Sequence, residues 1–120
     1  MAAPFPIDDE AYRGCEYVRQ TVLLGGYTGA DFSSLAFVVR QQIPPSWSSS
    51  DADALAKVTL AGGGIEIAGD VVTVTVPHSV TRSWPLGVVY AELTGILQAS
   101  GHREPLAAGT IHVRGDLGRA

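Results

Sequence analysis

The feature that most constrains the fold is a series of short apolar segments, rich in β-branched residues and separated by turn-forming residues. The clearest is Val71–Val76 (VVTVTV), whose valines and threonines alternate after Val71 and so fall on opposite faces of a strand. Turn signals recur about every 8–12 residues, the spacing of antiparallel β-proteins. The other strands predicted in this way are Cys15–Leu24, Leu35–Gln42, Ala54–Leu60, Ile65–Ile67, Val88–Gln98 and Pro105–Val113.

The segment from Ser50 to Leu60 admits two interpretations. Ser50 ahead of an Asp/Ala run is typical of a helix cap. However, Lys57–Leu60 alternates in polarity and runs into the three glycines of Gly62–Gly64, as in a hairpin. We favour the strand. Residues 79–87 read as a connector with room for one helical turn.

About seven strands at this spacing predict an all-β fold, an antiparallel β-sandwich. A parallel sheet needs crossover connections of about a dozen residues or more, usually helical, and the sequence offers none. With 120 residues, the chain has the length of one domain. We assign residues 15–120 to a single sandwich domain and residues 1–14 to an extended N-terminal arm. Pro4, Pro6 and the acidic run Asp8–Glu10 are typical of an arm or a capped turn outside the core.

Composition excludes several classes of protein. A chain with 46% hydrophobic and 17% charged residues is not generally disordered. Its net charge is −4 and its basic residues are scattered, so we expect no nucleic-acid partner. No apolar run has the roughly 20 residues of a membrane-spanning helix, and no basic region precedes an apolar stretch, so we expect neither a membrane span nor a signal peptide. The low charge favours a domain that hides surface in an assembly, with a compact apolar monomer as the alternative.

The titratable residues do not form a recognisable site. His78, His102 and His112 lack the close spacing of metal ligands. Glu66 and Glu92 are expected to face outward from strands, which leaves no pair of acids over a cleft. We therefore predict no catalytic residue, no metal and no cofactor, and a function that is not enzymatic.

Three further motifs have simple structural interpretations. Cys15 is the only cysteine, so it cannot form an internal disulfide, and we expect a buried thiol. The glycine clusters lack the Lys-Ser/Thr of a phosphate-binding loop, and no serine lies in a G-x-S-x-G motif. Residues 114–116 spell Arg-Gly-Asp, the integrin-recognition tripeptide, which we interpret as a chance match at a strand end.

Large aromatic residues in connectors have two possible roles. Tyr27, Trp47 and Trp84 either close the ends of the sandwich or contact a partner, by protein binding or by stacking on sugar rings. As interaction residues we select these three together with Phe5 and Ile7 of the arm. We expect the arm to become ordered on a neighbouring subunit. The loops at residues 25–30 and 44–53 would form a second contact, centred on Trp47.

The order of elements from Phe32 to Arg119 resembles that of small β-sandwich virion proteins of tailed bacteriophages, such as the N-terminal domains of baseplate upper proteins and fibre adaptors. The resemblance lies in the segments FVVR, GGGIEIAGDVVTVTVP, SVTRSWPLG, VVYAEL and GTIHVRGD. It implies an immunoglobulin-like sandwich with a structural role in the virion, at the tail or baseplate in preference to the head. It also implies synthesis in the host cytoplasm and assembly with other virion proteins and with further copies of itself. The alternatives are a head decoration protein and a carbohydrate- or receptor-binding module.

Overall fold

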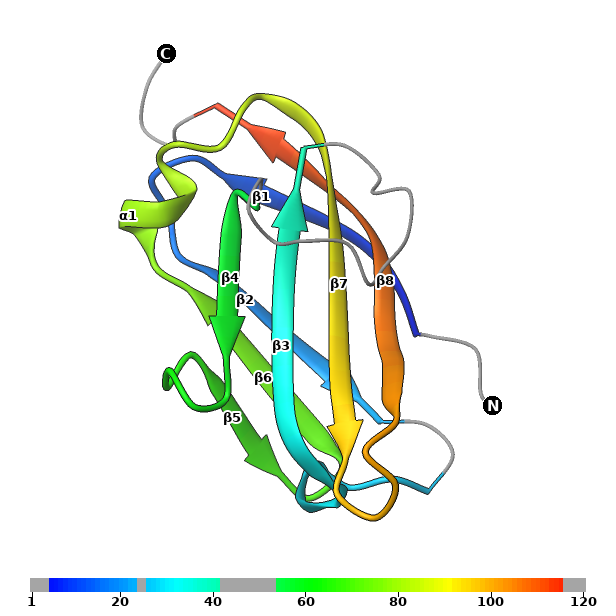
Figure 1. Cartoon of the computed structure of the whole chain (residues 1–120). Coiled ribbons are helices and arrows are strands. Elements are labelled where there is room, and N and C mark those ends of the chain that lie inside the picture. Colours follow the sequence, from blue (N-terminus) through cyan, green and yellow to red (C-terminus); the bar gives the residue numbers. More distant parts are fainter. Residues whose placement is uncertain (1–4, 24–25, 42–53, 116–120) are drawn as a thin grey trace.

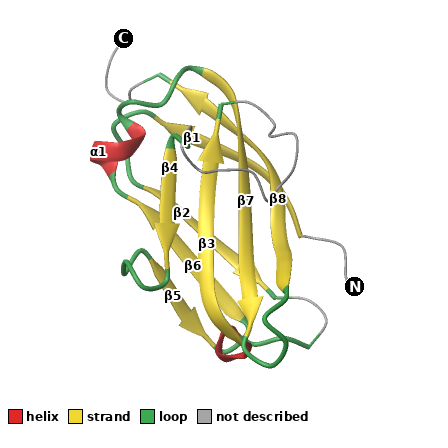
Figure 2. Cartoon of the chain, viewed as in Figure 1, coloured by secondary structure: helices red, strands yellow, loops and turns green. Residues whose placement is uncertain are grey.

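The computed structural model describes residues 5–23, 26–41 and 54–115, which fold into two stacked β-sheets (Figure 1). Two single-turn helices accompany the strands in these residues, a 3₁₀ turn η1 and a short α-helix α1 (Figure 2). The elements, in chain order, are β1 (Phe5–Tyr12), β2 (Tyr17–Val22), η1 (Gly29–Asp31), β3 (Phe32–Arg40), β4 (Ala56–Thr59), β5 (Ile65–Ala68), β6 (Val71–Val76), α1 (His78–Thr81), β7 (Gly87–Leu97) and β8 (Arg103–Arg114).

One sheet has five strands in the order β1-β8-β7-β3-β4, and the other has three in the order β2-β6-β5. The prediction of an all-β sandwich is confirmed. Every strand pairing is antiparallel except that of β1 with β8, which is parallel. This parallel pair needs no helical crossover, because the rest of the sandwich itself connects its two strands.

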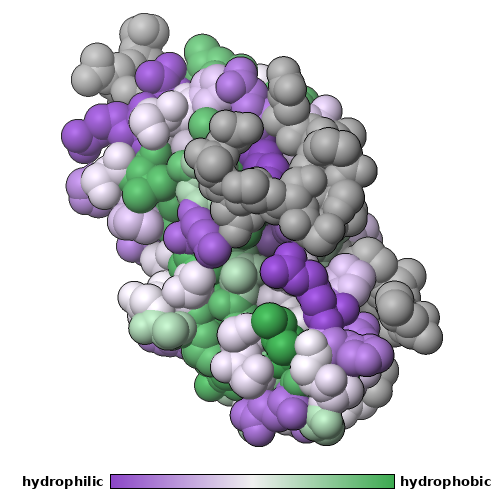
Figure 3. Space-filling model, viewed as in Figure 1, coloured by the Kyte–Doolittle hydropathy of each residue, from purple (hydrophilic) through white to green (hydrophobic). Residues whose placement is uncertain are grey.

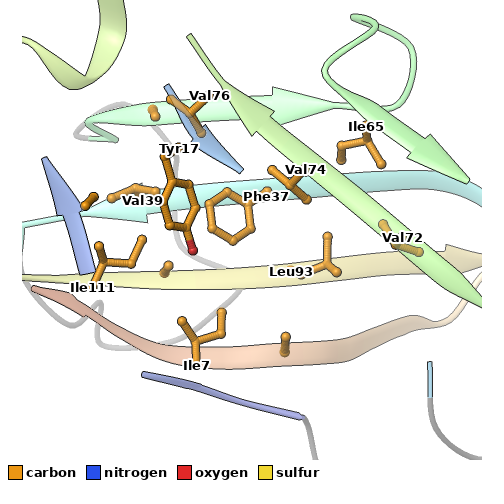
Figure 4. Close-up of a cluster of buried hydrophobic side chains, with 14 of the residues drawn as sticks. Ile7, Tyr17, Phe37, Val39, Ile65, Val72, Val74, Val76, Leu93 and Ile111 are labelled. Atoms are coloured by element: carbon orange, nitrogen blue, oxygen red, sulfur yellow. The ribbon is translucent and has the colours of Figure 1, made fainter. Parts of the chain in front are cut away.

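The core lies between the sheets and is built by alternation along the strands. Val72, Val74 and Val76 of β6 are fully buried, as the sequence predicted. Between them and the larger sheet, the rings of Tyr17 and Phe37 stack with their centroids 6.0 Å apart (Figure 4). A sandwich needs one apolar face from each sheet, and these strands supply it by placing every second side chain inward.

The first strand corrects the predicted arm. Residues 5–12 form β1 and pair with β8 along their whole length. Ile7 and Ala11 are buried in the core, with 3% and 5% of their surface exposed. Proline and acidic residues are tolerated because β1 is an edge strand whose polar side chains alternate with these two inward ones. Residues 5–12 therefore belong to the sandwich.

The connector between β6 and β7 contains the expected helical turn. Pro77 precedes α1, where a residue with a fixed φ and no N–H is well tolerated. The buried Thr81 at the end of this turn donates a hydrogen bond of 2.7 Å from its hydroxyl to the carbonyl of Cys15. This bond ties α1 to the turn between β1 and β2.

Candidate interaction surfaces

Two of the aromatic and apolar residues selected from the sequence lie in the core. Trp84 is 1% exposed, and its ring centroid lies 6.1 Å from that of Tyr17. Its indole N–H is buried and has no hydrogen-bond partner in the described structure. Ile7 is equally inaccessible. Neither side chain reaches the surface, so Trp84 closes the interior and Ile7 anchors β1, and the prediction that they contact a partner is wrong for this fold.

The remaining selected residues have different outcomes. Tyr27 is half-buried and packs edge-on against Phe32, with ring centroids 5.5 Å apart. It therefore serves as a loop anchor. Phe5 begins β1, but its side chain lies outside the described residues. Trp47 and the loop at 44–53 lie outside them as well.

A polar groove of about 510 Å³ runs between β1 and β2, where the two sheets meet along one side. Asp9 is one of the residues that line it. The Tyr17 hydroxyl donates a hydrogen bond to Asp9 Oδ2, and Arg19 Nη1 lies 2.7 Å from the same oxygen. Arg19 also donates to the Thr21 hydroxyl at 3.2 Å and to the Pro6 carbonyl at 3.2 Å. Arg19, which lies on β2 in the three-stranded sheet, thus links the first strand β1 to the opposite sheet.

This Asp9–Tyr17–Arg19 cluster has a clear electrostatic signature. Burial raises the pKa of the Tyr17 hydroxyl well above its ordinary value, and the hydrogen bond to the Asp9 carboxylate raises it further. The hydroxyl therefore stays protonated and remains a donor. Sequence reasoning missed this cluster, although the alternation Ile7, Asp9, Ala11 places Asp9 on the inward side of a strand.

A second groove, of about 690 Å³, lies on the opposite side of the sandwich, beside β4 and the β4–β5 turn. Its walls include Val58, Val76 and Val80. In Figure 3 hydrophobic atoms are visible on the side of the molecule where β4 and β5 lie. This groove is more apolar than the one between β1 and β2.

The outward side of the five-stranded sheet carries a buried ion pair. Arg40 Nη1 on β3 lies 3.3 Å from Glu92 Oε1 on the adjacent strand β7, and both side chains are almost fully buried. Glu92 was expected to face outward. Its side chain does lie on the other face of β7 from the inward Ala91 and Leu93, but it is buried and paired with Arg40. Burial of both charges makes the pair costly to break.

The outward side of the three-stranded sheet, which we call the β2 face, exposes apolar residues. Val18 and Val22 of β2 are 52% and 46% exposed. They lie opposite Thr75 and Val71 of β6 in the strand register. At the outward register positions of β2, β5 and β6, the one charged side chain is Glu66 of β5, which lies opposite Thr73. The β2 face is thus weakly charged and partly apolar.

The residues with catalytic or metal-binding chemistry are dispersed. His78, His102 and His112 are exposed on α1, a turn and β8. Within the described part of the chain, no group of three or more His, Cys, Asp or Glu residues is placed to hold a metal ion. Cys15 is a half-buried free thiol. None of the helices in these residues is long and apolar enough to span a membrane.

No family model matches the sequence, and no curated protein matches it significantly.

Proposed function

We propose that this chain is a structural, non-enzymatic subunit of a tailed-phage virion, an adaptor that joins other proteins in the tail or baseplate. The segments that carry the resemblance to phage virion proteins fold as β3, the β5–β6 hairpin, the α1 connector, β7 and β8. The strand order further supports an immunoglobulin-like sandwich. In that fold β2-β6-β5 would correspond to strands B-E-D, and β8-β7-β3-β4 to G-F-C-C′.

The observation that carries the proposal is the exposed apolar surface of the β2 face. Val18 and Val22 present two half-exposed apolar side chains on one side of the three-stranded sheet. Burying about half of each valine against a neighbour is worth about 1 kcal/mol per side chain. Two valines alone do not make a stable interface, since specific interfaces bury roughly 800 Å² on each partner. A face of this size suits a subunit held by several neighbours at once.

The first test is immunogold electron microscopy of particles from the producing culture, with antibody raised against the recombinant chain. Label confined to the tail or its tip is the expected result. Label on the head would favour a head decoration protein over a tail adaptor, and absence of label from particles would overturn a virion role.

A second test addresses the β2 face directly. Val18→Asp/Val22→Asp should abolish incorporation into particles while the purified variant keeps its β-sheet circular dichroism, because both side chains are already half-exposed. Ser79→Asp is the matched control, since it adds charge at an exposed position on α1. Incorporation of the double variant at the control level would exclude the β2 face as the contact.

A further inference from the structure

The first strand β1 forms one edge of the five-stranded sheet, with β8 on one side only. The phase of this parallel pairing is fixed where the Arg13 N–H donates a hydrogen bond of 3.2 Å to the Arg114 carbonyl. In a parallel pair, alternate residues of a strand direct both main-chain groups to the partner. Odd-numbered residues of β1 therefore face β8, and even-numbered residues direct their N–H and C=O groups outward.

Two contacts from outside the sheet agree with this phase. Arg19 Nη2 donates to the Pro6 carbonyl at 3.2 Å, and the Cys15 N–H donates to the Tyr12 carbonyl at 3.1 Å. Both acceptors are even-numbered, and the missing N–H of Pro6 also falls on the outward side. Between these capped ends lie Asp8 and Glu10. No main-chain hydrogen bond from the described residues reaches the N–H or C=O groups that they direct outward.

The space beside this edge fits an additional strand. The polar groove is lined by residues 9–12 and 15–20, that is, by β1, the following turn and β2. A strand added at the usual spacing of about 4.8 Å would lie above the groove. Its main chain would pair with Asp8 and Glu10, and every second side chain would enter the groove.

The charges along the outer edge of β1 indicate which side chains an added strand carries. The side chains of Asp8, Glu10 and Glu16 are exposed along the edge and the groove. Of the nearby cations, Arg19 pairs with Asp9 at 2.7 Å, Arg114 pairs with Glu10 at 2.9 Å, and the Arg13 guanidinium donates to the Arg82 carbonyl at 3.4 Å. The remaining exposed acids, Asp8 and Glu16, outnumber Arg13, so the edge keeps an excess of negative charge. A second copy of β1 would bring acidic residues opposite acidic residues, which destabilises strand pairing, whereas basic residues would stabilise it.

We propose that the outer edge of β1 binds an extended segment of another polypeptide that carries lysine or arginine, by strand addition through the main chain of Asp8 and Glu10. This inference goes beyond the virion role, because strand addition is a property of the isolated chain and can be measured without particles.

The test uses the full-length protein and a short peptide of alternating lysine and valine with blocked ends. Saturating peptide should slow hydrogen exchange of the Asp8 and Glu10 amides by at least about tenfold. The same peptide N-methylated at every residue has no N–H group on either edge with which to pair and should have no effect. Unchanged exchange at these amides, or equal binding of the methylated peptide, would overturn the proposal.

Substitutions then test the charge argument. Asp8→Lys should weaken peptide binding about fivefold or more at low salt, because an attraction becomes a repulsion. Glu66→Lys is the matched control, since it reverses an exposed acid on β5 in the other sheet. Equal affinities of the two variants, or preference for a glutamate-valine peptide, would contradict a basic partner.

Discussion

Gly109 lets the first strand approach the last, and its replacement by alanine tests whether that approach holds the fold together. A Cβ atom at Gly109 would lie 2.0 Å from the main-chain oxygen of Ile7. No flexible side chain can relieve this clash, so β1 must move away from β8. Elsewhere, Gly→Ala at a compatible position stabilises a protein by about 0.4–1 kcal/mol, so even the sign of the effect is informative.

The magnitude follows from what β1 contributes. Detaching it exposes Ile7, worth about 2–3 kcal/mol, and the methyl of Ala11, worth about 0.8 kcal/mol. It also strains the hydrogen bonds of Asp9 with Tyr17 and Arg19, at about 1 kcal/mol each. Partial relaxation reduces this total, and we expect Gly109→Ala to lower the free energy of unfolding by about 2–4 kcal/mol. That is a large part of the roughly 5–15 kcal/mol of a typical domain.

The assay is urea denaturation followed by tryptophan fluorescence, with hydrogen exchange at the Ile7 and Ala11 amides. The variant should unfold at a urea concentration lower by about 1–2 M and lose protection at both amides. Gly115→Ala is the control, because a Cβ there meets nothing within 4 Å. If Gly109→Ala unfolds with the wild type and keeps these amides protected, β1 does not depend on close approach to β8.

Two further substitutions test the buried polar groups. Tyr17→Phe should cost about 1–2 kcal/mol at neutral pH by removing the donor to Asp9. Because the folded pKa of Tyr17 is raised above its ordinary value of 10.0, the unfolded chain loses this proton first. The wild type should therefore lose stability as pH rises above 10.0, by up to about 1.4 kcal/mol per unit, and this component should be missing from Tyr17→Phe in urea titrations at alkaline pH. Glu92→Ala should cost about 3–5 kcal/mol because it leaves the Arg40 guanidinium buried without that carboxylate, whereas Arg40→Met/Glu92→Leu should be close to neutral in the same assay. Equal losses in the single and double variants would refute the argument that removing one member of this buried pair costs more than removing both.

The sequence predicted the interior of the fold better than its edge. Val71–Val76 and Val88–Gln98 were predicted as strands and form β6 and β7, and the alternate valines of β6 share one face as predicted, because a half-buried strand must repeat with period two. β1 was not predicted, because Pro6 and the acidic run Asp8–Glu10 are typical of an arm outside the core, and only two residues of the segment point inward. Only the position of β1 at a sheet edge makes those residues compatible with a strand.

The candidate surfaces depended on tertiary contacts that no local pattern contains. Trp84 lies in a connector, where a large aromatic is either exposed or buried, and its burial depends on how α1 packs on the turn near Cys15. Asp9 and Arg19 meet only because β1 and β2 belong to different sheets whose edges face each other. Arg40 and Glu92 meet because β3 and β7 are neighbours.

The parallel pairing of β1 with β8 also determines how the molecule carries a load. The start of β1 and the end of β8 lie at opposite ends of this pair, because Phe5 is level with Ala107 and Tyr12 with Arg114. Tension applied at these two points acts along both strands and tends to slide one past the other. The main-chain hydrogen bonds between the two strands then bear the load together and do not break one after another. We expect single-molecule pulling through these points to require a higher force than peeling β1 sideways from β8, and equal forces would contradict it. Tension between these two points therefore loads the pair of β1 and β8 in shear.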